Sequence, residues 1–267
     1  MTSSEARQPA SSANLSAKSE SLSTESLSMM SRAELLKLHR MAKELQRREQ
    51  RNRITTYFDT PEIRAAYKKQ MEFFRLGATF NEVALFGGNR TGKTVAGGCQ
   101  DVYHLTGLYP DWWDGKRFST PTDGWSAGTT AKKVRDITQE LLIGKPGNEA
   151  ARGTGLIPGD LILRTTVKHG IADAIESVFV RHVPTGGVST LQFKSYDQGR
   201  EAFEGTAQHF IHLDEEPPED VYTECLLRIM TTKGLLTLTA TPLLGLTKLM
   251  LLFLPELQPT PEPEVKA

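Results

Sequence analysis

Residues 82–94 constrain the fold of this chain more than any other stretch, because an apolar run there leads directly into a glycine-bearing turn. Residues 87–94 match the spacing G-x-x-x-x-G-K-[ST] of a phosphate-binding loop. The glycines let successive backbone N–H groups point at a phosphate, Lys93 adds charge near the β- and γ-oxygens, and the Thr94 hydroxyl can ligate Mg²⁺. A helix expected from Val95 would direct its positive N-terminus at the same phosphates. The stretch predicts a nucleoside triphosphate site formed by Gly87, Gly88, Asn89, Arg90, Thr91, Gly92, Lys93 and Thr94.

A second motif occupies residues 209–217, where an apolar run ends in acidic residues. This pattern places Asp214 at the carboxyl end of a core strand, which is where ligands gather in open α/β sheets. Asp214 can hold Mg²⁺, directly or through water, and Glu215 is placed to polarise the attacking water. Asp214 follows Lys93 by 121 residues (214 − 93 = 121). The acidic motif is weak alone, but the two motifs together strongly indicate a nucleotide-hydrolysing site.

The remaining patterns predict a three-layered α/β fold, with a mainly parallel sheet and helices on both faces. We expect a helix over residues 60–77, with Thr60 as its N-cap and Pro61 at its first position, and another over residues 131–143. Thr129 and Thr130 are the expected caps of the second helix, and antiparallel strands from residues 161–196 extend the sheet. Besides the strand before each motif, strands are expected at residues 124–128, 161–167, 174–183, 188–196 and 235–241.

Two polar features have more than one interpretation. Gln70 lies 17 residues before Gly87 (87 − 70 = 17), and its amide offers a donor and an acceptor side by side, which suits the edge of adenine. The alternative for Gln70 is an exposed polar residue on a helix. Thr239 and Thr241 end a buried strand, where a hydroxyl could sense the γ-phosphate and pass on its loss. Alternatively, these hydroxyls only cap the turn before Pro242.

The two ends of the chain differ in composition from its middle. A Ser-rich stretch without aromatic residues opens the chain and is expected to be disordered. Ser31 and Glu34 then form a capping box for a helix whose basic end, residues 47–53, could touch DNA or another subunit, or could simply be solvated. The predicted divisions are a disordered N-terminus at 1–30, a helix at 31–53, an ATPase domain at 54–254 and a tail or linker at 255–267.

Charge and cysteine content exclude little. The formal net charge is zero, so any DNA contact would have to come from local basic clusters. Cys99 and Cys225 lie far apart without metal-ligand neighbours, which is typical of buried thiols in a reducing compartment. The sequence shows neither a signal-peptide pattern nor an apolar run long enough to span a bilayer. We therefore expect a soluble, intracellular protein with no membrane partner. A pair of adjacent tryptophans at residues 112–113 could form an aromatic surface or pack half-buried.

Four segments resemble the ATPase half of the large terminase subunit, the DNA-packaging motor of tailed phages. They are residues 69–74, 87–94, 213–216 and 239–242, which occur in the order typical of that family. The resemblance implies a three-layer P-loop NTPase that is RecA-like and of the additional-strand catalytic glutamate type. By this resemblance, Gln70 contacts adenine, Lys93, Thr94 and Asp214 bind phosphate and Mg²⁺, and Glu215 is the catalytic carboxylate. Thr239, Ala240 and Thr241 couple hydrolysis to DNA movement. Arg90 is the first candidate for charge stabilisation and Arg200 the second, although either could instead neutralise phosphate or form loop salt bridges.

The implied function is ATP hydrolysis with Mg²⁺ that powers movement of double-stranded viral DNA into a procapsid. The implied partners are DNA, the small terminase subunit, the portal of the procapsid and further copies of the chain in a ring, in the cytoplasm of a bacterial host. Only 25 residues follow Pro242 (267 − 242 = 25), so we expect no nuclease activity from this chain. The alternatives are a helicase-like ATPase and a truncated, non-catalytic prophage remnant that binds only nucleotide or a partner.

Overall fold

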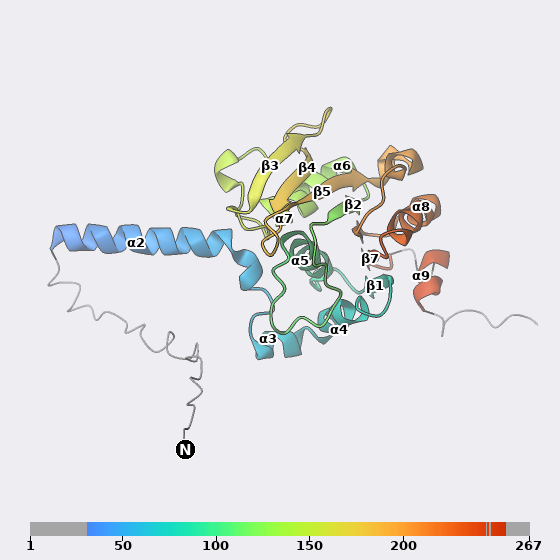
Figure 1. Cartoon of the computed structure of the whole chain (residues 1–267), viewed down its shortest axis with the longest axis horizontal. Helices are drawn as coiled ribbons and strands as arrows, with labels where there is room; N and C mark the ends of the chain where they lie inside the picture. Colours follow the sequence, from blue (N-terminus) through green and yellow to red (C-terminus); the bar gives the residue numbers. More distant parts are fainter. Residues whose placement is uncertain (1–30, 244, 246, 255–267) are drawn as a thin grey trace, which may run out of the picture. The chain divides into compact units, whose positions relative to one another are not determined.

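The computed structural model describes residues 31–243, 245 and 247–254 (Figure 1). The chain divides into two compact units, residues 1–48 and 49–267. The predicted disordered N-terminus and the predicted tail at 255–267 lie outside the described residues. Within the described residues, no helix is both long enough and apolar enough to cross a membrane.

The first helix among the described residues, α2 (Arg32–Arg51), begins at the predicted capping box. The Ser31 backbone N–H donates to the Glu34 carboxylate at 2.8 Å, and the Glu34 N–H donates to the Ser31 hydroxyl at 3.3 Å. The prediction of a helix to residue 53 extends too far, because the chain leaves the α-helix after Arg51 and continues as a 3₁₀ turn, η3 (Arg53–Thr55). Of the predicted basic end, the side chains of residues 47–51 lie outside the described part. Arg53 is bound within its own unit, since its guanidinium donates to the Tyr57 hydroxyl.

Seven strands form one sheet whose topology confirms the predicted class. The order across the sheet is β1-β7-β6-β2-β5-β4-β3. The first five strands in this order run parallel, and the last two pair antiparallel, as predicted. β7 lies between the phosphate-loop strand β1 and the acidic strand β6, which is the inserted strand of the additional-strand type. The strands are β1 (Glu82–Phe86), β2 (Asp123–Gly128), β3 (Ile162–Val167), β4 (Ile175–Arg181), β5 (Val188–Ser195), β6 (Phe210–Asp214) and β7 (Leu235–Ala240).

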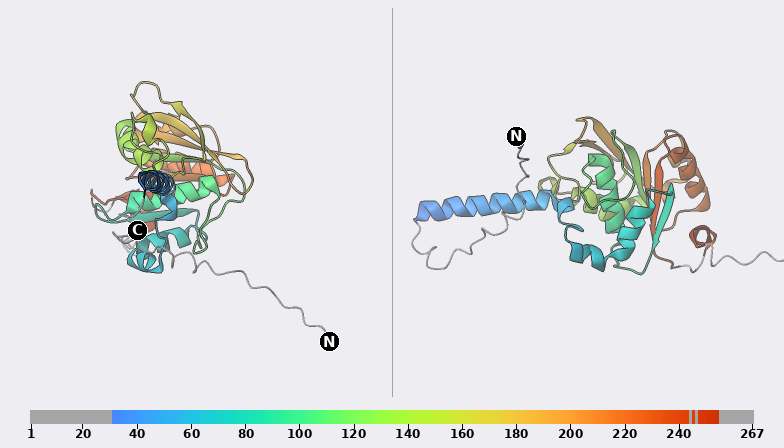
Figure 2. Two further views of the ribbon diagram at one scale, coloured as in Figure 1. Left: turned by 90° about the vertical axis from the view of Figure 1, so that its left-hand side faces the viewer. Right: turned by 60° about the horizontal axis from the view of Figure 1, so that its bottom comes forward.

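Helices cover both faces of the sheet and create a separate core on each (Figures 1 and 2). α5 (Lys93–Thr106) packs on one face, where its Cys99 and Val102 are fully buried. α8 (Glu219–Met230) and α9 (Lys248–Phe253) belong to the core on the other face. Every residue of β6 and β7 is buried because both faces of these strands are covered. This arrangement is typical of parallel strands in three-layered proteins, and the α/β class predicted from the sequence is confirmed.

The helix predicted over residues 60–77 is broken in two, so that prediction was partly wrong. α3 (Pro61–Ala66) begins as expected, with the Thr60 hydroxyl accepting from the Ile63 N–H. At Tyr67 the backbone leaves the helical region (φ −107°, ψ 45°), and α4 (Lys68–Leu76) restarts after it. The Tyr67 ring packs edge-on against Phe58, with 5.8 Å between ring centroids. No Gly or Pro marks the break, so only this tertiary packing distinguishes the position.

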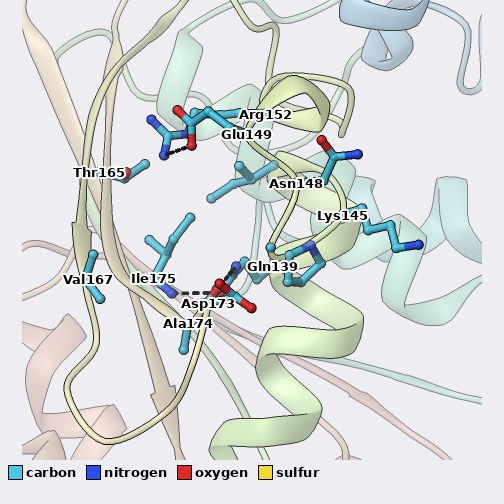
Figure 3. Close-up of a pocket in the computed structure, with 13 residues that line it drawn as sticks. Gln139, Lys145, Asn148, Glu149, Arg152, Thr165, Val167, Asp173, Ala174 and Ile175 are labelled. Carbon is cyan, nitrogen blue, oxygen red and sulfur yellow. Dashed lines mark hydrogen bonds and ion pairs between the residues drawn. The ribbon is translucent and has the colours of Figure 1, made fainter.

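The helix predicted over residues 131–143 is present but irregular. Thr130 caps it by accepting from the Lys133 N–H, whereas the Thr129 hydroxyl has no partner among the described residues. The segment comprises α6 (Ala131–Lys133), a π-helical turn from Val134 to Gln139, and α7 (Glu140–Ile143). At the end of the π-helical turn, the Gln139 amide donates to the Asp173 carbonyl at 2.9 Å and accepts from the Ile175 N–H at 2.8 Å (Figure 3). One side chain thus holds the loop between β3 and β4 against the helix.

The adjacent tryptophans and the two cysteines contribute to the cores. Trp113 is buried against Phe74, with ring centroids 4.9 Å apart, and Trp112 is half-buried, so packing accounts for the pair. Cys99 and Cys225 are free and buried, as predicted. Burial raises the pKa of Cys225 to about 12, which keeps this thiol neutral and unreactive at neutral pH.

Candidate functional site: a phosphate-binding loop beside two acidic residues

The phosphate-binding loop connects the end of β1 to the start of α5. Gly92 is the residue before the helix and has φ 81°, a left-handed conformation that glycine adopts without strain. Lys93 is 7 % exposed and its ammonium donates to the Gly88 carbonyl at 2.8 Å, so the side chain lies over the loop and does not extend into solvent. Thr91 also donates to the Gly88 carbonyl, at 2.9 Å. The loop is therefore closed by its own side chains around the N-terminus of a helix, which is an anion-binding arrangement.

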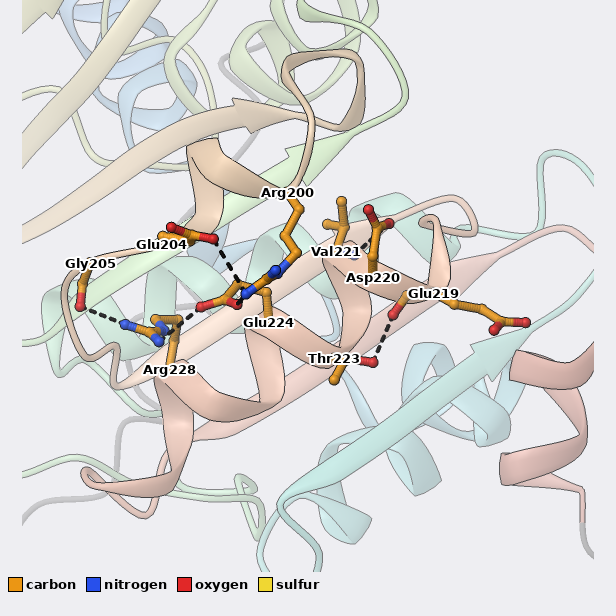
Figure 4. Close-up of polar contacts among 9 residues, drawn as sticks. All are labelled: Arg200, Glu204, Gly205, Glu219, Asp220, Val221, Thr223, Glu224 and Arg228. Atoms are coloured by element: carbon orange, nitrogen blue, oxygen red, sulfur yellow. Dashed lines mark hydrogen bonds and ion pairs between the residues drawn. The ribbon is translucent and has the colours of Figure 1, made fainter.

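Arg90 and Arg200, the two arginines considered for charge stabilisation, are in different environments. Arg90 is an exposed loop residue with φ 61°, and its guanidinium has no hydrogen bond or ion pair with any described residue. Arg200 instead pairs with the carboxylates of Glu224 at 2.9 Å and Glu204 at 3.3 Å (Figure 4). Glu224 is 2 % exposed and is shared with Arg228 at 2.8 Å. These contacts favour the salt-bridge interpretation of Arg200 and leave Arg90 free to meet a phosphate.

Asp214 lies opposite the phosphate-binding loop at the end of β6. Its Oδ1 accepts from the Thr94 hydroxyl at 2.9 Å and from the Thr239 hydroxyl at 2.7 Å. The parallel register pairs Asp214 with Thr239, which explains the second contact. The carboxylate is 8 % exposed. Residues from α5, β6 and β7 thus converge on one carboxylate oxygen, because the carboxyl ends of parallel strands meet at one edge of the sheet.

Glu215 follows directly in a strained backbone conformation. Its φ of 62° is unfavourable for a non-glycine residue, at an order of 1–3 kcal/mol, and persists only where the surroundings enforce it. The Glu215 N–H donates to the Thr239 carbonyl at 2.8 Å, and the single hydroxyl hydrogen of Tyr196 lies within reach of the carbonyls of both Asp214 and Glu215, at 3.1 and 3.0 Å. The Oε2 atom accepts from the Thr241 N–H at 3.1 Å. Within the described chain, Oε1 has no hydrogen-bond partner and can accept from a water.

The end of β7 contacts both motifs. The Ala240 carbonyl accepts from the Gly87 N–H at 3.3 Å, which extends the strand pairing into the phosphate-binding loop. The Thr241 hydroxyl donates to the Asn89 side-chain oxygen at 3.3 Å. Since the Thr241 N–H also bonds to Glu215, this strand end lies between the loop and the acidic pair. The threonines therefore do more than cap the turn.

Gln70 belongs to the site and is not the exposed helix residue considered as its alternative. It is 7 % exposed, and its Nε2 donates to the Thr91 carbonyl at 2.7 Å, which ties α4 to the phosphate-binding loop. It also lines a hollow of about 500 Å³ beside the loop, together with Tyr67, Leu85 and Phe86. This hollow has the size and the mixed apolar and polar lining of a small-molecule pocket.

Sequence reasoning assigned no role to His212 and Asp101, which are connected to the site. The His212 Nδ1 lies 2.8 Å from the Asp101 carboxylate, and its Nε2 lies 2.9 Å from the Thr239 hydroxyl. Burial disfavours a charge on this imidazole, but the charge and hydrogen bond of Asp101, with the charge of Asp214, outweigh it, so the pKa of His212 is raised. The available signal was a histidine within an otherwise apolar buried strand.

The residues at this edge fit a magnesium ion. Mg²⁺ prefers hard oxygen ligands and usually relies on one or two protein groups plus phosphate oxygens. The Thr94 hydroxyl and the Asp214 carboxylate are such groups, and Oδ2 of Asp214 has no hydrogen-bond partner among the described residues. The described residues contain no cluster of three or more His, Cys, Asp or Glu side chains that could hold a metal by themselves.

The family model of the terminase large subunit, T4likevirus-type, N-terminal, matches residues 84–266, which is more than half of the chain. The chain belongs to the terminase large-subunit family. It is 33 % identical over 206 residues to the large terminase subunit of Salmonella phage P22, covering 71 % of this chain but 41 % of that protein. The terminase chain therefore spans about two fifths of the length of this curated relative. Family membership confirms the resemblance, and the matched residues include three of the four sequence segments, 87–94, 213–216 and 239–242. No observation favours the helicase-like alternative.

Solved structures of terminases are also similar to this chain. The ATPase domain of the large terminase of Thermus phage P74-26 matches with 18 % identity and a TM-score of 0.47, over 70 % of this chain and 71 % of that one. The large terminase of a thermophilic bacteriophage, in complex with ADP, matches with 15 % identity and a TM-score of 0.40, over 65 % of this chain and 37 % of that one.

Proposed function

We propose that this terminase chain hydrolyses ATP with Mg²⁺ and that hydrolysis drives double-stranded viral DNA into a procapsid. The observation that carries this proposal is the convergence at one sheet edge of the loop residues Lys93 and Thr94 with Asp214 and Glu215. The 2.9 Å hydrogen bond from Thr94 to Asp214 joins the two motifs directly. Phosphoryl transfer needs positioned cations, a positioned water and little covalent chemistry, and this edge offers groups for each.

Each polar group has a separate role in the proposed reaction. The backbone N–H groups of the loop bind the β-phosphate, and Lys93 moves from the Gly88 carbonyl to the β/γ oxygens. Thr94 and Asp214 would hold Mg²⁺, which supplies charge neutralisation on the phosphates when bound. Glu215, held at Oε2 by the Thr241 N–H, orients the attacking water through Oε1. Arg90, which is unpaired among the described residues, stabilises charge on the γ-phosphate.

The base lies in the hollow beside Gln70 in this proposal. Because Nε2 of Gln70 is bonded to the Thr91 carbonyl, its Oε1 is the atom available to accept from an adenine amino group. Occupancy of the base site would then act on the loop that holds the phosphates. Loss of the γ-phosphate would be sensed by the end of β7, Thr239 to Thr241, which contacts both Asn89 and Glu215.

The partners proposed for the motor are double-stranded DNA, the small terminase subunit and the portal of the procapsid, in the cytoplasm of a bacterial host. A ring of further copies is proposed because an exposed arginine can complete a neighbour's site as well as its own. Neither nuclease activity nor a membrane partner is part of this proposal.

The test is release of phosphate from ATP, measured with and without Mg²⁺ over a range of protein concentrations. The wild-type chain is compared with Glu215→Gln and Lys93→Ala, and thermal unfolding checks that each variant is folded. We expect Mg²⁺-dependent turnover that Glu215→Gln lowers at least 100-fold while nucleotide binding is retained, whereas Lys93→Ala lowers both. Turnover that rises more than linearly with concentration supports assembly. Equal turnover in all three proteins contradicts the site assignment.

A further inference from the structure

We propose that Asp101, His212 and Thr239 form a positioning relay that holds Asp214 in the orientation required to bind magnesium. The relay comprises three hydrogen bonds in series: Asp101 to His212 at 2.8 Å, His212 to Thr239 at 2.9 Å, and Thr239 to Asp214 at 2.7 Å. It deepens the proposed function, on which it rests, because it assigns to two residues remote from the nucleotide a part in the metal site.

The directions of two of the three hydrogen bonds follow from the acceptor at the end of the relay. An ionised Asp214 carboxylate can only accept, so the single hydroxyl hydrogen of Thr239 points at its Oδ1. The oxygen of Thr239 must then accept from His212, which fixes a hydrogen on Nε2 of the imidazole. The remaining ring nitrogen, Nδ1, faces Asp101 and shares a proton with that carboxylate. Asp101 thus sets the ring orientation in which His212 serves Thr239.

The relay is enclosed by the neighbouring strands β6 and β7 and by α5. Asp101 is 1 % exposed, and His212 and Thr239 are fully buried. Gly97, one turn before Asp101 on α5, provides the space for the imidazole, because a Cβ there would lie 2.2 Å from the ring. A buried ionisable pair is weak evidence for stability, since apolar residues of similar volume often replace such pairs without loss. Because the Asp101–His212 pair lies behind the Asp214 carboxylate, we assign to it the positioning of that carboxylate and not a contribution to stability.

Thr239 differs from the other donor to Asp214 in one respect. Thr94 both donates to Oδ1 of Asp214 and is the proposed metal ligand, so it has two competing uses for its hydroxyl group. Thr239 is buried behind the carboxylate and has no such second use. Its hydrogen bond can hold Oδ1 in place and leave Oδ2 directed to the loop. Partners of this kind typically affect metal affinity or activity 10–100-fold when they are removed.

Two pairs of matched variants separate positioning from packing. His212→Gln keeps an amide nitrogen near the place of Nε2 and can still donate to Thr239, whereas His212→Asn keeps one near Nδ1 and cannot. Thr239→Ser keeps the hydroxyl, whereas Thr239→Val replaces it with a methyl group that can neither donate nor accept. The measurement is calorimetric titration of each full-length variant with ADP, in Mg²⁺ and in EDTA, after thermal unfolding has confirmed that the variant is folded.

The readout is the factor by which Mg²⁺ tightens ADP binding. We expect His212→Asn and Thr239→Val to lower that factor about tenfold, with ADP affinity in EDTA unchanged, and His212→Gln and Thr239→Ser to restore most of it. If Mg²⁺ tightens ADP binding to folded Thr239→Val by the same factor as in the wild type, the relay is overturned. It is also overturned if the variant loses ADP affinity equally in Mg²⁺ and in EDTA, because that result marks a purely structural role. If His212→Asn does not fold, the Thr239 pair decides. A wild-type chain that binds ADP equally in both solutions contradicts the proposed magnesium site itself, and the relay with it.

Discussion

Gly97→Ala is the substitution whose effect can be worked out most directly from the structure. Gly97 lies in the middle of α5, where alanine is normally the better helix former by about 1 kcal/mol. In this chain its added Cβ would lie 2.2 Å from both Cε1 and Nε2 of His212. Because the imidazole is fully buried between α5 and β6, it cannot turn into solvent. The ring must shift by about 1 Å or more, and its hydrogen bonds to Asp101 and Thr239 are stretched or lost.

The expected magnitude combines three effects. Overpacking a dense core typically costs about 1–3 kcal/mol, and each buried hydrogen-bonding group left without its partner costs about 1–3 kcal/mol. The gain in helix propensity offsets about 1 kcal/mol. We therefore expect Gly97→Ala to lower the free energy of unfolding by about 3 kcal/mol, which corresponds to a fall in Tm of about 6–12 °C in a domain of this size.

The neighbouring residue supplies the control. At Gly98 an added Cβ would meet methyl groups of three leucine side chains at 3.0–3.4 Å, which can yield by a few tenths of an ångström. Gly98→Ala should therefore change stability by no more than about 1 kcal/mol, since mild crowding and better helix propensity oppose each other. Urea unfolding followed by circular dichroism measures both variants. Equal stability of the two alanine variants would refute the reasoning, because they share every property except the neighbour of the new methyl group.

Three further predictions concern other parts of the domain. Glu224→Ala removes the 2 % exposed carboxylate that Arg200 and Arg228 share. It should lower the free energy of unfolding, measured by urea titration, by about 2 kcal/mol. This loss is smaller than that for a fully buried ion pair because Arg200 is half exposed. Arg200→Ala should lower ATP turnover less than threefold and Arg90→Ala more than tenfold in a phosphate-release assay; the reverse order would contradict the assignment of Arg90. Burial lowers the pKa of His104 to about 3, so below pH ~6.5 the native state binds fewer protons at this residue than the unfolded chain does. The contribution of His104 to the free energy of unfolding should therefore be complete above that pH and fall by about 2 kcal/mol at pH 5. Urea midpoints measured at pH 7 and pH 5 should differ less in His104→Phe than in the wild type.

Local spacing was enough to predict the parts of the site that depend on neighbouring residues. The phosphate-binding loop is defined by glycines and a lysine at fixed separations, and Asp214 and Glu215 follow an apolar strand, so both motifs were found without knowledge of the fold. Parallel pairing then explains why they meet, because loops at the carboxyl ends of such strands lie at one edge. The sequence predicted β7 as a buried strand but not its place in the sheet, which the strand order shows to be between β1 and β6.

Features that depend on contacts between distant segments could not be predicted. The break at Tyr67 coincides with packing of its ring on Phe58 and carries no Gly or Pro. The link between His212 and Asp101 joins residues 111 positions apart (212 − 101 = 111), and a single histidine in an apolar strand does not indicate its partner. The sequence singled out Gln70 by its distance from the loop, but its bond to the Thr91 carbonyl depends on how α4 restarts after the break.

The position of β7, with a strand paired on each side, also limits how this domain can change in length. Its residues pair with β1 on one side and β6 on the other, with Ala240 opposite Phe86 and Thr239 opposite Asp214. Because side chains alternate between the two faces of a strand, one inserted residue would bring an apolar neighbour opposite Asp214 and turn the hydroxyl into the other core. Such an insertion would break both pairings at once, and no bulge at a free edge could absorb it. Substitutions within β7 can therefore change single contacts and leave the strand pairing intact, whereas an insertion or deletion there disrupts both pairings and the contact with Asp214 together.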